Sequence, residues 1–106
     1  MVVPIARPFV GQLEKKFAKD AINSGWISSN GKYIEKFELE IKKTLKAKNC
    51  VVCSNGSVAL FMALKALGIG NNDEVIVPDL SYSATINAVI NVGAKPVLSE
   101  VDLNSW

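Results

Sequence analysis

The sequence predicts an α/β fold in which parallel strands are joined by crossover helices. Three short stretches rich in β-branched side chains have the length of buried strands, at residues 49–54, 74–78 and 95–101. An apolar segment of helical length follows each of the first two, at residues 57–67 and 81–92. This alternating order requires parallel pairing through right-handed crossovers, and it predicts a sheet covered by helices.

Two amphipathic helices are predicted ahead of the first strand. Residues 12–24 carry apolar side chains at helical spacing, and Gly25 is placed to end this helix in a left-handed conformation. Residues 33–46 carry apolar side chains on one face and mostly charged side chains on the other. We expect the charged face to be solvated.

The loop between these helices, residues 25–31, is polar and bracketed by glycines, yet it contains Trp26 and Ile27. Something should therefore cover the indole ring. Trp26 either fills the local core between the two helices or contacts a ligand or another subunit.

The two central helices differ from the first two in being almost entirely apolar. Residues 57–67 are apolar on nearly every side, so we expect this helix to be buried and to end at Gly68. Residues 81–92 form a similar segment, with Gly93 placed as its cap.

The composition indicates one soluble globular domain. The chain has 106 residues, of which 49% are hydrophobic and 21% charged, so a real core is possible and disorder is not expected. A net charge of +2, with lysines spread through the helices, does not indicate a nucleic-acid partner. Residues 1–8 lack the apolar stretch of a signal peptide, and no run is long enough to span a membrane, so we expect a cytoplasmic protein.

The absence of histidine limits the chemistry that the chain can perform. It removes the usual general base and every Ser-His or Cys-His nucleophile, so hydrolase functions are disfavoured and no catalytic residue is assigned. Cys50 and Cys53 alone provide too few ligands for zinc, so we assign no metal site. Both thiols are expected to be buried in a reducing cytoplasm.

The turn Ser54-Asn55-Gly56-Ser57 is the strongest candidate for a binding site. It lies between a predicted strand and a predicted helix, where unpaired backbone amides point outward and favour a phosphate. Gly56 would let the backbone approach the phosphate closely, and Ser57 could donate from its amide and its hydroxyl. The turn contains no acid, base or metal ligand, so its partner would be a phosphorylated cofactor that brings its own chemistry.

The ends of the other two strands should meet the same edge of the sheet. They carry Asp79-Leu80-Ser81-Tyr82 and Glu100-Val101-Asp102, at the edge where ligands bind in parallel sheets. Tyr82 could lie flat against a ring or could simply pack. A phosphate with an aromatic ring indicates pyridoxal phosphate or a nucleotide. A Rossmann-type site is disfavoured because the first turn has one glycine where the dinucleotide fingerprint has three.

Segments along the whole chain carry a resemblance to a known family. In order they are IARPFVG, SGWISSNGKYIEKFE, SNGSVALFMALKALGIG, DEVIVPDLSYSATINAVINVGAKPV and VDLNSW. The sequence resembles the N-terminal part of the DegT-type sugar aminotransferases, a family of fold-type-I pyridoxal phosphate enzymes. The SGWISSNGKYIEKFE segment makes it most similar to the perosamine-synthase-like members, which aminate 4-keto-6-deoxy nucleotide sugars.

The resemblance implies roles for five residues. Gly56 and Ser57 would hold the phosphate of pyridoxal 5'-phosphate through backbone amides, with help from the Ser57 hydroxyl, and Tyr82 would stack on the pyridine ring. The family more often has Thr at the position of Ser57, which keeps the hydroxyl. Trp26 and Ser28 would lie near the sugar-nucleotide site at a subunit boundary, and a homodimer is implied as well.

The resemblance also implies a division of the chain and a reaction. Residues 1–106 would be a partial pyridoxal-phosphate-binding large domain, with N-terminal helices and an active-site loop over residues 1–47 and a βαβαβ cofactor-binding part over residues 48–106. The reaction would transfer an amino group, expected to come from glutamate, to a keto-sugar nucleotide.

The sequence departs from the family in one important respect. It stops before the region where the family has its Schiff-base lysine and the aspartate that pairs with the pyridinium nitrogen, and nothing places Lys65 or Lys95 at the cofactor. We therefore expect an N-terminal fragment or a split half that is inactive alone. The alternative is a non-catalytic α/β binding or assembly module that keeps only the phosphate cradle.

Overall fold

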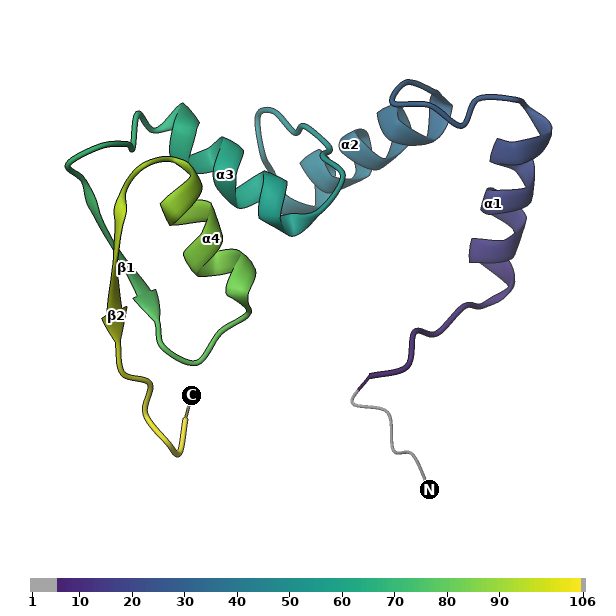
Figure 1. Cartoon of the computed structure of the whole chain (residues 1–106). Helices are drawn as coiled ribbons and strands as arrows, with labels where there is room; N and C mark the ends of the chain where they lie inside the picture. The colour runs from purple at the N-terminus through teal and green to yellow at the C-terminus, as the bar shows by residue number, and fades with distance from the viewer. Residues whose placement is uncertain (1–5, 106) are drawn as a thin grey trace. The chain divides into compact units, whose positions relative to one another are not determined.

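The computed structural model describes residues 6–105 and contains four helices and two strands in this part of the chain (Figure 1). The chain divides into two compact units, and the boundary falls between Val52 and Cys53. Ile5 and Trp106, which belong to the first and last of the family-like segments, lie outside the described residues, as does most of the stretch searched for a signal peptide.

The first unit contains the two predicted amphipathic helices, α1 (Gln12–Asn23) and α2 (Lys32–Leu45). The helix α1 ends as expected, because Gly25 has a φ of +73° and its amide donates to the carbonyl of Ile22 over 3.0 Å. At the end of α2, Lys46 adopts the left-handed conformation, and the amide of Ala47 bonds back to the carbonyl of Lys42.

The second unit contains α3 (Gly56–Ala66), β1 (Glu74–Pro78), α4 (Ser83–Asn91) and β2 (Lys95–Ser99). The two strands pair in parallel with Glu74 opposite Lys95, and α4 forms the crossover between them. Gly68 and Gly93 have φ angles of +78° and +88° just after α3 and α4. The predicted glycine caps of both central helices are therefore confirmed, as is the α/β class.

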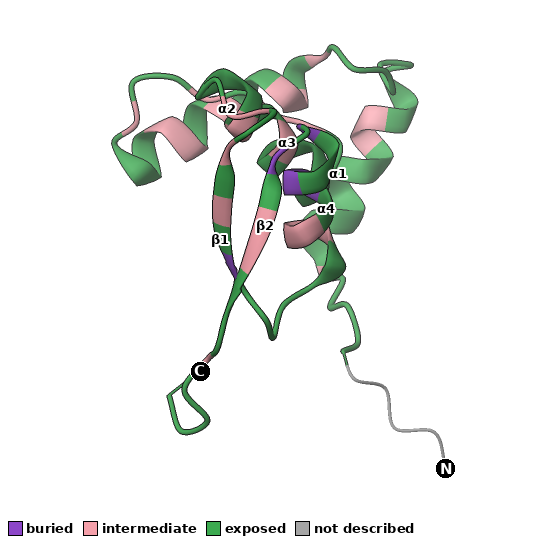
Figure 2. Ribbon diagram, turned by 60° about the vertical axis from the view of Figure 1, so that its left-hand side comes forward, coloured by how far each residue is buried: buried purple, intermediate pink, exposed green. Residues whose placement is uncertain are grey.

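The core lies where α4 packs on the two strands. Val77, Val89, Val92 and Ala94 are buried there, and half-buried apolar side chains of α3 and its neighbours pack around them. Figure 2 shows how few residues of the chain are buried, and those of the core belong to the second unit. The hydrophobic stabilisation of the described structure is therefore concentrated in one small cluster.

The prediction of a strand over residues 49–54 is wrong. The structure has no strand there, and Val51 is 70% exposed. A strand needs a partner for its backbone groups, and the described sheet contains only β1 and β2. The amide of Val52 instead donates to a carboxylate oxygen of Glu38 over 2.9 Å.

Two predictions of complete burial are also wrong. The helix α3 has no buried residue, because α4 is its main packing partner among the described elements. The sheet is covered on one face by α4, whereas Ile76 and Leu98 remain 75% and 61% exposed. Apolar composition showed that these surfaces favour burial, but the described residues do not supply enough partners to achieve it.

No helix in the described part of the chain is long and apolar enough to cross a membrane.

Candidate functional site

The N-terminus of α3 has the geometry of an anion cradle. Asn55 is the N-cap residue, and its side-chain oxygen accepts a hydrogen bond from the amide of Val58 over 3.0 Å. The amide of Ala59 bonds to the carbonyl of Asn55, which starts the helical ladder. The amides of Gly56 and Ser57 precede this ladder, so they have no acceptor inside the helix and remain available to a ligand.

The space around Gly56 fits a phosphate. A Cβ atom built on Gly56 would meet no atom within 4 Å, and Ser57 is exposed next to it. The backbone can therefore be approached closely at this point. The amides, the open space and the Ser57 hydroxyl together match the donor set expected for a cofactor phosphate.

Tyr82 occupies the corresponding position on the neighbouring helix. It is the N-cap residue of α4, its side chain makes no capping hydrogen bond, and the ring is 86% exposed. The helices α3 and α4 pack against each other, so both N-terminal turns belong to one packed unit. No described interaction joins the Tyr82 ring to Ser57. That both residues bind one ligand stays a prediction.

The ends of the two parallel strands meet as predicted. The amide of Asp79 donates to the carbonyl of Ser99 over 3.0 Å, which brings the segments after β1 and β2 side by side. The Asp102 carboxylate is occupied within its own turn, since it accepts from the amides of Asn104 and Ser105. These hydrogen bonds lower the pKa of Asp102, and the bond from the Ser105 amide has the largest effect. The turn at Ser54 does not end a strand, so the predicted meeting of three strand ends is reduced to two.

Trp26 and Ser28 lie together in the first unit. Both line a hollow of about 250 Å³ in the loop between α1 and α2, with Asn30 and Gly31. Trp26 is 64% exposed, which contradicts the expectation that the two helices would cover its ring. The explanation of Trp26 as a core residue between these two helices is therefore wrong within the described structure, and its contact with a ligand or another subunit stays a prediction.

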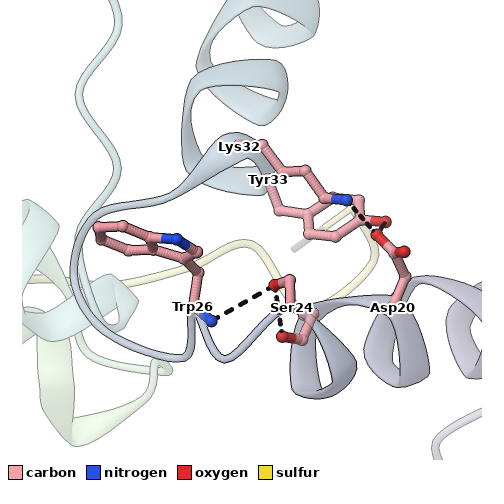
Figure 3. A network of polar contacts seen from close by, with 6 residues as sticks. Asp20, Ser24, Trp26, Lys32 and Tyr33 are labelled. Atoms are coloured by element: carbon pink, nitrogen blue, oxygen red, sulfur yellow. Dashed lines mark hydrogen bonds and ion pairs between the residues drawn. The ribbon is translucent and has the colours of Figure 1, made fainter.

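A polar network ties the two ends of this loop together (Figure 3). The Asp20 carboxylate, in the last turns of α1, accepts a hydrogen bond from the Tyr33 hydroxyl over 2.6 Å and pairs with the Lys32 ammonium. The Tyr33 ring also packs on Phe17, with 5.6 Å between ring centroids. Sequence reasoning missed this network because its members are 12 and 13 residues apart on different helices.

The network shifts the pKa values of its members. The Lys32 ammonium and then the Tyr33 hydroxyl lower the pKa of Asp20, because both donate to its charged form. The same bonds raise the pKa of Lys32 and of Tyr33. All three groups are reached by solvent, so these shifts describe a local preference and not a large contribution to stability.

The remaining reactive side chains do not form a further centre in the described residues. Cys50 and Cys53 are free and only half-buried, contrary to the expectation of full burial. No group of three potential metal ligands occurs between residues 6 and 105. Lys95 pairs with Glu74 over 2.7 Å, and this contact raises the pKa of Lys95.

These features together define a class of protein. A parallel α/β unit carries an open helix N-terminus suited to a phosphate and an exposed aromatic ring on the adjoining helix. This combination is typical of α/β proteins that bind a phosphorylated cofactor.

Comparison with known proteins identifies the family. Residues 9–106 match the DegT/DnrJ/EryC1/StrS aminotransferase family, and the chain belongs to it. It is 46% identical over 101 residues to the GDP-perosamine synthase of Vibrio cholerae, an alignment that covers 95% of this chain and 28% of that protein.

Solved structures agree with this assignment. The sugar aminotransferase Spr1654 from Streptococcus pneumoniae, solved in pyridoxal phosphate and pyridoxamine phosphate forms, superposes with a TM-score of 0.85 at 28% identity, over 97% of this chain and 26% of that one. The Escherichia coli GDP-4-keto-6-deoxy-D-mannose-3-dehydratase with bound hydrated pyridoxal phosphate gives 0.83 at 28% identity, over 96% and 28%. The chain thus spans little more than a quarter of the length of these relatives.

Proposed function

We propose that this chain is the phosphate-binding and substrate-loop part of a pyridoxal-phosphate-dependent aminotransferase that acts on nucleotide sugars. The observation that carries the proposal is the family match over residues 9–106, which includes the open N-terminus of α3. The family and the cofactor-bound structures among the neighbours of this chain indicate pyridoxal phosphate as the cofactor.

The residues of the second unit would hold the cofactor at two points. The amides of Gly56 and Ser57 and the Ser57 hydroxyl would donate to the phosphate, whose negative charge also suits the N-terminus of α3. Tyr82 would offer its exposed ring to the face of the pyridine. When bound, pyridoxal phosphate supplies an electron-withdrawing ring that stabilises negative charge on a substrate carbon.

The residues of the loop would recognise the substrate. Trp26 and Ser28 line one hollow, where an indole ring and a hydroxyl could contact a sugar or a base. The similarity to GDP-perosamine synthase supports a nucleotide-linked keto-sugar as amino acceptor, with glutamate as the expected donor. The cofactor-bound dehydratase among the structural neighbours shows that cofactor binding alone does not define the reaction.

The catalytic lysine is proposed to lie outside these 106 residues. After Ser57 the sequence contains only Lys65 and Lys95, and Lys95 is already paired with Glu74. In this proposal residues 1–47 form the helices and substrate loop, residues 48–106 form the cofactor-binding part, and the lysine comes from a longer polypeptide or a second one. A cytoplasmic homodimer completes the proposal.

The proposal can be tested by blocking the phosphate cradle with one side chain. Gly56→Val should weaken pyridoxal phosphate binding by at least about tenfold, because its branched side chain crowds amides that each make a charge-assisted bond to phosphate. The new Cβ meets no atom within 4 Å, so the helix should still form. Titration of the cofactor into the wild-type and variant chains, followed by absorbance, measures the difference.

Ala59→Val is the matched control, since it adds a similar side chain to an exposed position one turn further along α3. Equal affinity of the Gly56→Val and Ala59→Val variants for pyridoxal phosphate would refute a phosphate site at the N-terminus of α3. Borohydride reduction tests whether the lysine lies outside this chain. A stable lysine label on the isolated chain would contradict the assignment of the lysine to another polypeptide.

A further inference from the structure

We propose that the hollow between α1 and α2 is a second anion site, one that binds a diphosphate group. Four lysines line it: Lys16 and Lys19 from α1, and Lys32 and Lys36 from α2. The hollow belongs entirely to the first unit and uses none of the residues of the α3 turn. The proposal therefore does not depend on the transfer of an amino group.

The charge of this hollow is unusually high for the chain. Four lysines and the single carboxylate of Asp20 give it a formal charge of +3, whereas the net charge of the whole chain is +2. Asp20 pairs with Lys32, and no ion pair within residues 6–105 involves Lys16, Lys19 or Lys36. Three ammonium groups in the hollow therefore lack a described anionic partner.

The placement of these lysines includes like-charge pairs on both helices. Lys16 and Lys19 are three positions apart on α1, and Lys32 and Lys36 are four apart on α2, so each pair brings like charges together on one helix face. Lys32 also lies in the first turn of α2, where the helix dipole disfavours a cation. Asp20 follows Lys16 and Glu40 follows Lys36 by four positions, so these carboxylates offset part of the repulsion within each helix. A bound anion would relieve the rest.

The hollow also has the size and donors that such a ligand needs. Its volume is about 360 Å³. A water molecule takes roughly 30 Å³ in the liquid, so a diphosphate group fits with part of its hydration. Asn23 lines the same hollow and can donate from its side-chain amide. Ammonium groups from two helices, three of them without a described ion pair, suit two linked phosphates better than one. The sequence suggested lysines spread through separate helices, whereas the fold gathers these four.

The test compares two double variants that remove the same charge. Lys16→Gln/Lys19→Gln should weaken the binding of inorganic pyrophosphate by at least about tenfold, since each lost charge-assisted contact is worth about that factor. Lys48→Gln/Lys65→Gln removes two exposed lysines that also lack a described ion pair but lie outside the hollow, and it should change binding less than about twofold. Isothermal titration of the full chain at low ionic strength measures both affinities.

Further ligands identify the source of the diphosphate. A nucleoside diphosphate that binds at least as tightly as pyrophosphate supports a nucleotide, whereas binding of pyrophosphate alone supports the free anion. Equal weakening by the two double variants, or wild-type binding no tighter than that of chloride, would overturn the proposal. Pyridoxal phosphate binding is measured alongside and should survive Lys16→Gln/Lys19→Gln, so failure of this site and failure of the cofactor cradle are distinguishable.

Discussion

Tyr82 combines an exposed aromatic ring with a backbone that does not depend on it. Its carbonyl accepts from the amide of Thr85, and its side chain has no capping role in α4. We therefore predict that Tyr82→Ala lowers the affinity for pyridoxal phosphate by about two- to tenfold, the value of one aromatic stacking contact, with little change in stability.

Tyr82→Phe is the control for this prediction, because it keeps the ring and removes only the hydroxyl. It should bind the cofactor like the wild type in the same absorbance titration. If the phenylalanine variant loses as much affinity as the alanine variant, the ring is not a stacking platform.

Asp20 makes a pH-dependent contribution to the first unit. Its pKa is lowered in the folded chain, so the stabilisation is fully present above its ordinary pKa, near about pH 4, and is lost as the pH falls through the lowered value. The charged and titratable groups facing it are Tyr33, Lys32 and Lys36 on α2 and Lys16 and Lys19 on α1. We predict that Asp20→Asn lowers the thermal midpoint by a few degrees at pH 7 and by less near pH 3.

The matched control for Asp20→Asn is Glu40→Gln, which removes an exposed pair with Lys43 within α2. It should change the midpoint less at pH 7, because it joins no two elements. Thermal unfolding followed by circular dichroism at both pH values measures each change. An Asp20→Asn effect that is unchanged between pH 7 and pH 3 would show that the charge is not responsible.

Individual residues were predictable where one residue type alone has the required property. Gly25, Gly68 and Gly93 were recognised as helix ends because only glycine adopts positive φ without cost, and all three do so. The Asp20 network was not predictable, because pairing across a loop depends on how two helices pack. The exposure of Trp26 was missed for the same reason.

At the scale of elements, α3 depends on its cap. The side chain of Asn55 accepts the amide of Val58, which satisfies one of the unpaired donors at the helix start. We predict that Asn55→Ala destabilises the chain by about 1 kcal/mol. Urea unfolding measures the change against Asn49→Ala, an exposed asparagine with no described side-chain hydrogen bond. Equal effects of the two substitutions would show that the cap contributes nothing.

Helices were predicted more accurately than strands. All four helices begin and end within about two residues of the positions that periodicity and glycines indicated, because both signals are local. The segment 49–54 has strand-like composition yet forms no strand, because pairing depends on a neighbour that the described sheet does not provide. The composition of residues 49–54 therefore indicated that the segment favours burial, but it did not determine the secondary structure.

At the scale of the whole chain, the α/β class and the family follow from the order of elements and motifs. The sequence also predicted full burial of α3 and of both sheet faces, which the structure does not show. The exposed side chains of Ile76 and Leu98 mark apolar surface that lacks a described partner. The helix start proposed as the cofactor cradle could be predicted from sequence because it consists of consecutive residues. The lysine hollow could not, since its residues come from two helices.

In the function proposed for this chain, the N-terminus of α3 binds the phosphate of pyridoxal phosphate. Amide chemical shifts of the ¹⁵N-labelled chain test it most directly when the cofactor is added. We predict that the amides of Gly56 and Ser57 shift most, that they shift toward hydrogen-bonded values, and that inorganic phosphate moves them in the same direction. Unchanged Gly56 and Ser57 signals at cofactor concentrations that perturb other residues would contradict it.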